Sequence, residues 1–283
     1  MIEAVIDSVV PNSEVCAYKM LVLDLDDTLL TDDHCISPLN KEMLMKAQEL
    51  GVKVILASGR PTPAMMRYAE ELQLAEHGSF LISFNGATIT DLKKKEVVFE
   101  RSLSKEELHS LHDFSIENKV HIITYSEKGI VSESDSEYID VELLLTGLPH
   151  HKVKSFKEEV QSSAVKCILL EEPSYLKTVE DKLKAERTDL NVSISKPFFL
   201  EVTPQGIDKA ASIEILAQKL GIKPEEVIAV GNAGNDLSMI QYAGLGIWVD
   251  NVTPELRHHA DCIVASNNNH GVAEVVKRFI LMQ

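Results

Sequence analysis

Clustered carboxylates directly follow an apolar run in the segment YKMLVLDLDDTLLTDD, residues 18–33. They are Asp24, Asp26, Asp27 and, further on, Asp32. Like charges so close together repel, and carboxylates at the edge of a core lose solvation. Either these aspartates form a solvated turn, or a positive group meets them. Mg²⁺, which takes oxygen ligands, would offset the local negative charge.

Asp24 and Asp26 are two residues apart, and side chains with this spacing point to the same side of an extended chain. We therefore expect both carboxylates to face one site, with the hydroxyl of Thr28 bonding back to hold the turn. Two carboxylates with different surroundings can divide the work of catalysis. One serves as an ionised nucleophile and the other as a general acid.

Three further polar clusters follow apolar, strand-like segments later in the chain. They are Ser58, Gly59 and Arg60 after VKVILA, Lys209 in GIDKAAS, and Asn232, Asn235 and Asp236 in GNAGND. A small hydroxyl beside glycine at a helix start can donate to phosphate, and a lysine there is unfavourable unless anions face it. Taken singly, these clusters also fit a plain turn, a surface lysine and an Asx turn. Together, at the carboxyl ends of parallel strands, they would converge on one ligand site.

The elements that must position these residues alternate along the chain. Apolar strands alternate with helices, as in SPLNKEMLMKAQELG, where Ser37 is the expected N-cap, Pro38 the first helical residue and Gly51 the terminator. This alternation of strands and helices predicts an α/β fold with a Rossmann-like parallel-sheet core and helices on both faces. We also expect an amphipathic helix ending at Pro11 and a helix over TPELRHHA capped by Thr253.

The pattern changes in the middle of the chain, where strand-like segments come in neighbouring pairs. This pairing of neighbouring strands predicts an inserted α+β cap domain over residues 87–196, beginning with the hairpin ATITDLKKKEVVFERSL. The core then comprises residues 1–86 and 197–283, with residues 1–18 as an N-terminal extension. Asn85-Gly86 is the expected hinge, although Asn85 could also contact substrate. Asn267 could line the site or belong to a solvated loop.

Composition excludes several classes of function. The chain has 28 Lys and Arg against 44 Asp and Glu, a net charge of −16, so nucleic acid and anionic membrane are poor partners. No apolar run approaches about 18 residues, and no basic signal segment precedes the core. Four well-separated cysteines match no metal or disulfide pattern. The dinucleotide motif G-x-G-x-x-G is absent after the first strand, which argues against an NAD-dependent oxidoreductase. We expect a cytoplasmic monomer or homodimer.

The chain resembles the haloacid dehalogenase superfamily of phosphatases through four motifs in the order Asp24-x-Asp26-x-Thr28, Ser58, Lys209 and Gly231-x-x-x-Asn235-Asp236. The segments ISFNGA, GIDKA and ASNNNHGVAEVV are similar to its Cof-type branch, which carries a type IIB cap. The resemblance covers nearly the whole chain from Tyr18. It implies a mobile cap, Mg²⁺ as cofactor and hydrolysis of small phosphorylated metabolites such as sugar, nucleotide or cofactor phosphates.

The resemblance also implies a role for each motif residue. Asp24 would attack phosphorus and form an aspartyl-phosphate, while Asp26 would protonate the leaving oxygen and then activate water. Lys209 would steady Asp24 and, with Ser58, bind phosphoryl oxygens. The remaining implied residues are phosphate or substrate contacts (Thr28, Gly59, Arg60, Asn85 and Asn235) and metal ligands (Asp24, Asp26 with the neighbouring backbone carbonyl, Asn232 and Asp236).

Two residues depart from the family pattern. Asp27 stands where the family often has glycine, and we expect its side chain to point away from the site. Asn232 stands where an acidic metal ligand is usual, so the metal site loses one negative charge. The alternative function is therefore a weakened or inactive phosphometabolite-binding regulatory protein. In either case we expect the insertion to close over the strand ends and select the substrate.

Overall fold

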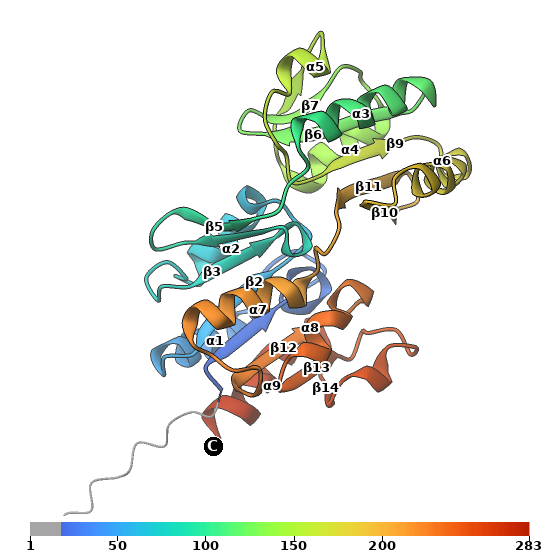
Figure 1. The fold of residues 1–283 in the computed structure, drawn as a ribbon. Coiled ribbons are helices and arrows are strands. Elements are labelled where there is room, and N and C mark those ends of the chain that lie inside the picture. Colours follow the sequence, from blue (N-terminus) through green and yellow to red (C-terminus); the bar gives the residue numbers. More distant parts are fainter. Residues whose placement is uncertain (1–17, 283) are drawn as a thin grey trace, which may run out of the picture.

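The computed structural model describes residues 18–282, so the expected N-terminal helix lies outside the described residues (Figure 1). Within this range an eight-stranded sheet forms the centre of the larger domain. From edge to edge its strands are β14 (Cys262–Val264), β13 (Leu245–Val249), β12 (Val227–Gly231), β1 (Met20–Leu23), β2 (Lys53–Ala57), β3 (Phe80–Ser83), β4 (Thr88–Asp91) and β5 (Glu96–Glu100). All pairs from β14 to β3 are parallel, whereas β4 and β5 are antiparallel additions.

Helices cover both faces of this sheet. Leu21 and Leu23 of β1 belong to a buried cluster with α1 (Pro38–Glu49), α2 (Thr62–Glu71) and α9 (Gly271–Val276). Met20 and Val22 point to the other face, into a cluster with α7 (Lys209–Leu220) and α8 (Leu237–Tyr242). Because every residue of β1 is buried, its run reads as continuously apolar. The predicted fold class is confirmed.

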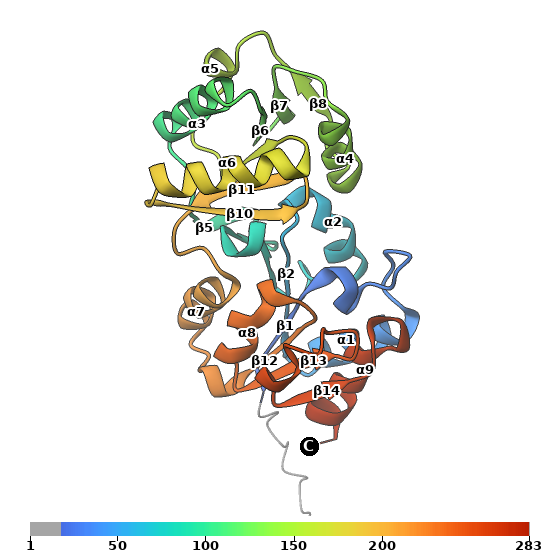
Figure 2. The ribbon, with the colours of Figure 1, turned by 90° about the vertical axis from the view of Figure 1, so that its right-hand side faces the viewer.

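The second domain is built on a six-stranded sheet and lies above the core in Figure 1. The strand order is β10 (Leu190–Lys196), β11 (Phe199–Pro204), β9 (Cys167–Leu170), β6 (His121–Ser126), β7 (Gly129–Ser132) and β8 (His150–Lys152). One face packs on α3 (Lys105–Glu117), α5 (Phe156–Glu159) and α6 (Pro173–Glu186), and the other packs in part on α4 (Glu137–Thr146). We call this domain the cap. Figure 2 shows β10 and β11 on its side nearest the core.

The expected domain boundaries were wrong at both ends. The hairpin β4–β5 pairs with β3 and extends the core sheet, so residues 88–100 are not part of the cap. Conversely, β11 pairs with β9 and β10 and belongs to the cap sheet. An antiparallel hairpin looks the same in sequence whichever sheet edge it joins. The chain therefore crosses to the cap after β5 and returns after β11.

Most local signals were read correctly. The Ser37 side chain accepts from the Asn40 amide at 3.2 Å, and Asp208 caps α7. The expected helix over TPELRHHA was wrong, because the segment forms turns and one 3₁₀ turn at Arg257–His259. There the Leu256 carbonyl accepts from the buried Trp248 indole at 2.9 Å, a tertiary contact that holds the turn. The segments that form α4, β8 and α5 were missed.

Candidate active site

A buried lysine lies between two carboxylates at the carboxyl end of the core sheet. Lys209 Nζ donates to Asp24 Oδ1 and to Asp236 Oδ1, each at 2.6 Å. The side chains of Lys209 and Asp236 are fully buried, and that of Asp24 is 7% exposed. Asp24 follows β1 and Asp236 follows β12, and these strands are parallel neighbours, so their ends meet. The convergence expected from the sequence is therefore present.

The charge of this cluster is unbalanced. Burial and the neighbouring Asp236 raise the pKa of Asp24 from 3.8 to about 7, against the opposing effect of Lys209. Burial works to lower the pKa of Lys209, but Asp24 and Asp236 outweigh it and raise that pKa. Two carboxylates against one lysine leave a net negative charge when all three are ionised. An added cation would favour the ionised form of Asp24.

Asp236 organises the loop after β12. Its Oδ2 accepts from the backbone amides of Asn232 at 3.0 Å and Ala233 at 3.1 Å. A Cβ at Gly231 would lie 2.5 Å from the Asp236 side chain, so the loop requires glycine there. Both oxygens of Asp236 accept hydrogen bonds from the protein, so this residue positions Lys209 and the loop, and its expected role as a metal ligand stays a prediction.

Thr28 contacts the same loop from the other side. Its hydroxyl donates to Asn232 Oδ1 at 3.1 Å, and its side chain is fully buried. Thr28 therefore orients Asn232, and its expected contact with substrate stays a prediction. A carboxamide oxygen has a second lone pair, so this bond leaves Asn232 Oδ1 able to ligate a cation.

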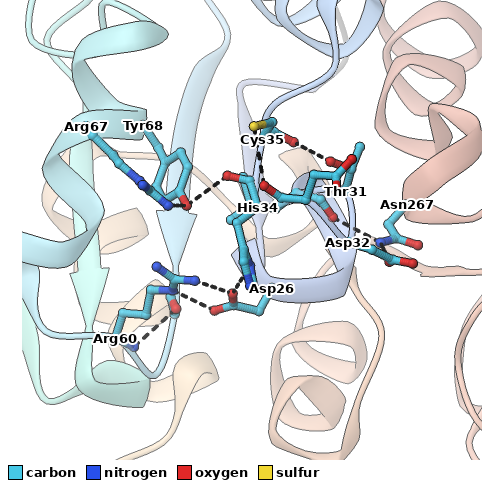
Figure 3. A network of polar contacts seen from close by, with 12 residues as sticks. Asp26, Thr31, Asp32, His34, Cys35, Arg60, Arg67, Tyr68 and Asn267 are labelled. Atoms are coloured by element: carbon cyan, nitrogen blue, oxygen red, sulfur yellow. Dashed lines mark hydrogen bonds and ion pairs between the residues drawn. The ribbon is translucent and has the colours of Figure 1, made fainter. Parts of the chain in front are cut away.

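Asp26 does not share the surroundings of Asp24. Arg60 holds it in a bidentate pair, with Nε–Oδ2 at 2.8 Å and Nη2–Oδ1 at 2.6 Å, and His34 Nδ1 lies 3.9 Å from Oδ1 (Figure 3). The Asp26 side chain is 42% exposed, whereas Asp24 is nearly buried. The two carboxylates thus differ in environment, as expected. However, Arg60, expected to contact phosphate, is engaged by Asp26, and no local sequence pattern predicts this pair.

The backbone leaves the extended conformation directly after Asp24. Residues 25–29 form a tight turn in which Asp27 has φ +57°, a left-handed conformation that favours glycine. Aspartate tolerates this region better than most residues. The Asp27 carbonyl also accepts from Asn251 Nδ2 at 2.7 Å. The alternation argument for Asp24 and Asp26 therefore does not apply, because the strand has ended.

Residues from three separate segments meet beside this turn. Ser58 is buried and its Oγ accepts from the Arg60 amide at 3.1 Å. Asn235 Nδ2 donates to Asn85 Oδ1 at 3.3 Å, and a Cβ at Gly59 would lie 3.1 Å from Asn85 Nδ2. The loops after β2, β3 and β12 are therefore interlocked at the expected phosphate end of the site.

Asn267 ties loops together and does not line the site. Its Nδ2 donates to the Leu30 carbonyl at 3.0 Å and to Asp32 Oδ1 at 3.1 Å, as Figure 3 shows for Asp32. The residue is buried. The fourth aspartate of the opening cluster, Asp32, thus belongs to the support of the turn.

The oxygen donors at this site fit Mg²⁺. Among residues 18–282 no group of three or more His, Cys, Asp or Glu side chains is arranged to hold a metal ion. Mg²⁺ needs only one or two carboxylates, because it keeps several waters. Asp24, whose second oxygen is not bonded to Lys209, can supply the carboxylate, and Asn232 Oδ1 and a backbone carbonyl of the turn can complete the set.

A cap domain over an aspartate–lysine cluster at the carboxyl end of a parallel sheet defines a capped hydrolase with a Rossmann-like core. The chain belongs to the haloacid dehalogenase-like hydrolases, because the model of that family matches residues 21–276. The predicted family membership and the prediction of a hydrolase are confirmed.

Individual relatives agree with this assignment. "Putative phosphatase YxeH" of Bacillus subtilis is 35% identical over 93% of this chain and 99% of its own length. A solved haloacid dehalogenase-like hydrolase from Bacteroides thetaiotaomicron is 37% identical, with a TM-score of 0.88 over 92% of this chain and 99% of that one. The subclass IIB sugar phosphatase BT4131 is 25% identical, with a TM-score of 0.77 over 92% of this chain and 98% of its own. No helix within the described residues is long and apolar enough to cross a membrane.

Proposed function

We propose that this protein is a Mg²⁺-dependent phosphatase that hydrolyses small phosphorylated metabolites through an aspartyl-phosphate on Asp24. The observation that carries the proposal is the buried Asp24–Lys209–Asp236 cluster next to a second, differently held carboxylate, Asp26. Relatives with names that specify phosphatase activity support it, among them the Bacillus subtilis 5-amino-6-(5-phospho-D-ribitylamino)uracil phosphatase YcsE, 28% identical over 93% of this chain and 96% of its own length.

In the first step the Asp24 carboxylate attacks phosphorus while the bond between phosphorus and the ester oxygen breaks. Asp26, in its protonated form, gives its proton to the departing oxygen, so an alcohol leaves and Asp24 carries the phosphoryl group. Lys209 keeps Asp24 oriented and offsets its charge. Ser58 and the amides near it bind the phosphoryl oxygens.

In the second step water attacks the same phosphorus and the Asp24–phosphorus bond breaks. Asp26, now ionised, takes the proton from water, and inorganic phosphate leaves. Asp24, Asn232 and a backbone carbonyl of the turn would hold Mg²⁺, which would supply charge neutralisation for the phosphoryl oxygens. Positioning and charge neutralisation are the principal requirements of this reaction.

The direct test is phosphate release from 4-nitrophenyl phosphate by the purified protein, with and without Mg²⁺. Turnover that requires Mg²⁺ and disappears in Asp24→Asn is expected. Equal turnover in that variant would show that Asp24 is not the nucleophile. A cytoplasmic location and a monomeric or homodimeric state remain predictions from the sequence.

Replacement of Arg60 by Ala is expected to lower kcat/KM by about 10- to 100-fold, because Asp26 loses the two hydrogen bonds that position its carboxylate. Arg60→Lys should recover little of the lost kcat/KM, because a lysine offers a point charge and no bidentate geometry. The thermal midpoint should change little, because a pair this exposed contributes about 0–1 kcal/mol.

The matched control is Arg67→Lys. Arg60 and Arg67 both lie over the Tyr68 ring, with guanidinium carbons 5.7 Å and 4.4 Å from its centroid, but Arg67 has no bond to Asp26 among the described contacts. Steady-state kinetics of the three variants decide the matter. If Arg60→Ala and Arg67→Lys lose activity equally, the Asp26–Arg60 pair has no catalytic importance.

Replacement of Asn232 by Asp is expected to lower the Mg²⁺ concentration for half-maximal activity by about 5- to 10-fold. A full charge about 4 Å from the cation is worth roughly 4 kcal/mol at an effective dielectric of 20, and desolvation removes much of it. The bond from Thr28 can be kept, because a carboxylate oxygen also accepts.

A second readout avoids dependence on turnover. Mg²⁺ should raise the thermal midpoint of Asn232→Asp more than that of the wild-type protein, because metal binding stabilises the folded state. Asn268→Asp, which adds the same charge at an exposed side chain whose oxygen accepts from the Asp32 backbone amide, is the control. Unchanged Mg²⁺ dependence in Asn232→Asp would place Asn232 away from the metal.

The alternative is a phosphometabolite-binding regulatory protein with little or no turnover. The observation that favours it is Asn232, which removes one charge from the expected metal site. Thermal stabilisation by phosphorylated metabolites without phosphate release, over a broad panel and at high Mg²⁺, would support this alternative over the phosphatase.

A further inference from the structure

A cleft lies between the cap and the core beside the interlocked loops. Its core side is formed by Gly59, Phe84 and Asn85, and it encloses about 400 Å³, open solvent at its mouth included. Gly59 follows the buried Ser58, and Asn85 bonds to Asn235, so the cleft adjoins the expected phosphate end of the site. A phosphoryl group held there would direct its leaving group into this cleft.

The cap side of the cleft is a set of polar residues, here called the cap polar patch. Its members are Lys166, Asn191, Ser193, Glu201 and Thr203. In β10 and β11, Asn191 is opposite Thr203 and Ser193 is opposite Glu201. Side chains two apart in a strand share a face, so these four point the same way. The intervening Val192, Ile194, Leu200 and Val202 point into the cap core.

The patch presents one balanced ion pair among neutral hydrogen-bonding groups. Lys166 Nζ lies 3.0 Å from Glu201 Oε1, and their side chains are 7% and 20% exposed. Among the described residues that line the cleft, Lys166 alone is cationic and Glu201 alone is anionic. A second phosphate in the leaving group would therefore meet a lysine already paired with a carboxylate.

Aromatic contacts hold the lysine in place at the junction of the two domains. The Phe84 and Tyr125 rings meet edge to face with centroids 5.5 Å apart. Lys166 Nζ lies 5.9 Å from the Phe84 centroid and 5.5 Å from that of Tyr125. Because Phe84 belongs to the core and Tyr125 to the cap, this contact sets the ion pair at a defined position over the cleft.

We propose that the cap polar patch selects an uncharged leaving group rich in hydroxyls, so that the preferred substrates are monophosphates of polyols or sugars, with Lys166 and Glu201 as the specificity-determining residues. This inference rests on the proposed phosphatase function. Neighbouring hydroxyls can donate to Glu201 and accept from Lys166 at once. A leaving group without hydroxyls leaves both partly buried charges without these bonds, which is the basis of discrimination.

The test compares matched substrates with the wild-type protein and Mg²⁺. Glucitol 6-phosphate should exceed n-hexyl phosphate in kcat/KM by at least about 10-fold, because only its hydroxyls can bond the pair. Fructose 6-phosphate should exceed fructose 1,6-bisphosphate. A preference for the bisphosphate, for hexyl phosphate or for a nucleoside monophosphate over the sugar phosphates would overturn the proposal.

Variants locate the discrimination in the ion pair. Glu201→Gln and the double variant Lys166→Met/Glu201→Gln should lower kcat/KM for glucitol 6-phosphate by about 10- to 100-fold, mainly through KM, and change 4-nitrophenyl phosphate turnover less than about 3-fold. The double variant removes both charges of the pair together, so neither partner is left without the other. Lys157→Met, which removes a surface pair with Asp113, is the control.

The outcomes also separate the two proposals. Equal losses on both substrates would show that the pair is only structural and would overturn the specificity role. Asp24-dependent turnover of 4-nitrophenyl phosphate without preference for hydroxylated substrates would overturn this inference alone. If the wild-type protein releases phosphate from none of these compounds, the proposed function fails and this inference fails with it.

Discussion

Replacement of Asp24 by Asn is expected to lower phosphate release at least about 1,000-fold, because an amide cannot act as the nucleophile. The fold should survive the change. Burial and Asp236 raise the pKa of Asp24 from 3.8 to about 7, so ionised Asp24 costs folding free energy at every pH above 3.8. This cost grows as the pH rises to about 7 and then stays constant, and asparagine does not carry it.

The thermal midpoint of Asp24→Asn at pH 8 without Mg²⁺ should therefore equal or exceed that of the wild-type protein. The difference should shrink toward pH 4, which is close to the unfolded-state pKa of 3.8, because most of the cost of ionising the folded carboxyl arises between pH 3.8 and about 7. Calorimetry at both pH values together with single-turnover phosphate release tests the pair of expectations. Loss of activity with a much lower thermal midpoint at pH 8 would mean that Asp24 is required for the fold itself.

Replacement of Lys209 by Met is expected to remove both activity and stability. The change leaves Asp24 and Asp236 buried at the end of the sheet without the cation that both contact at 2.6 Å. Removal of one member of a buried charge pair costs about 3–5 kcal/mol, which corresponds to roughly 10 °C in the thermal midpoint of a chain of this size.

Compensation separates the two effects of Lys209. The double variant Lys209→Met/Asp236→Asn removes one negative charge along with the positive one and should recover part of the stability, while phosphate release stays lost. Lys219→Met, at the exposed last turn of the same helix, should leave both properties unchanged. Recovery of activity in the double variant would show that Lys209 acts only through the fold.

Local patterns in the sequence were enough to predict much of the fold. The apolar run of β1 is buried on both faces and therefore predicts an inner strand of a parallel sheet. Caps such as Ser37 and Asp208 were readable because their side chains bond amides only a few residues away. The meeting of Asp24 with Lys209 was also foreseeable, since the carboxyl ends of parallel strands lie at one edge.

Contacts between distant segments could not be read in this way. The Asp26–Arg60 pair and the Thr28–Asn232 bond join residues whose spacing carries no local signal, and the turn after Asp24 ended the extended chain on which the sequence argument relied. The sheet that each hairpin strand joins was equally hidden, which placed both domain boundaries wrongly.

The sequence by itself determined the architecture of the core, the family and the aspartate and lysine at its centre, because strand periodicity, helix caps and motif order are local properties. Only the tertiary structure decided which groups each of these residues contacts and which polar residues of β10 and β11 face the cleft. The reason is physical: charge balance, burial and hydrogen bonding at the site depend on side chains brought together from distant strands and loops, as in the bond from Thr28 to Asn232, which joins residues 204 apart.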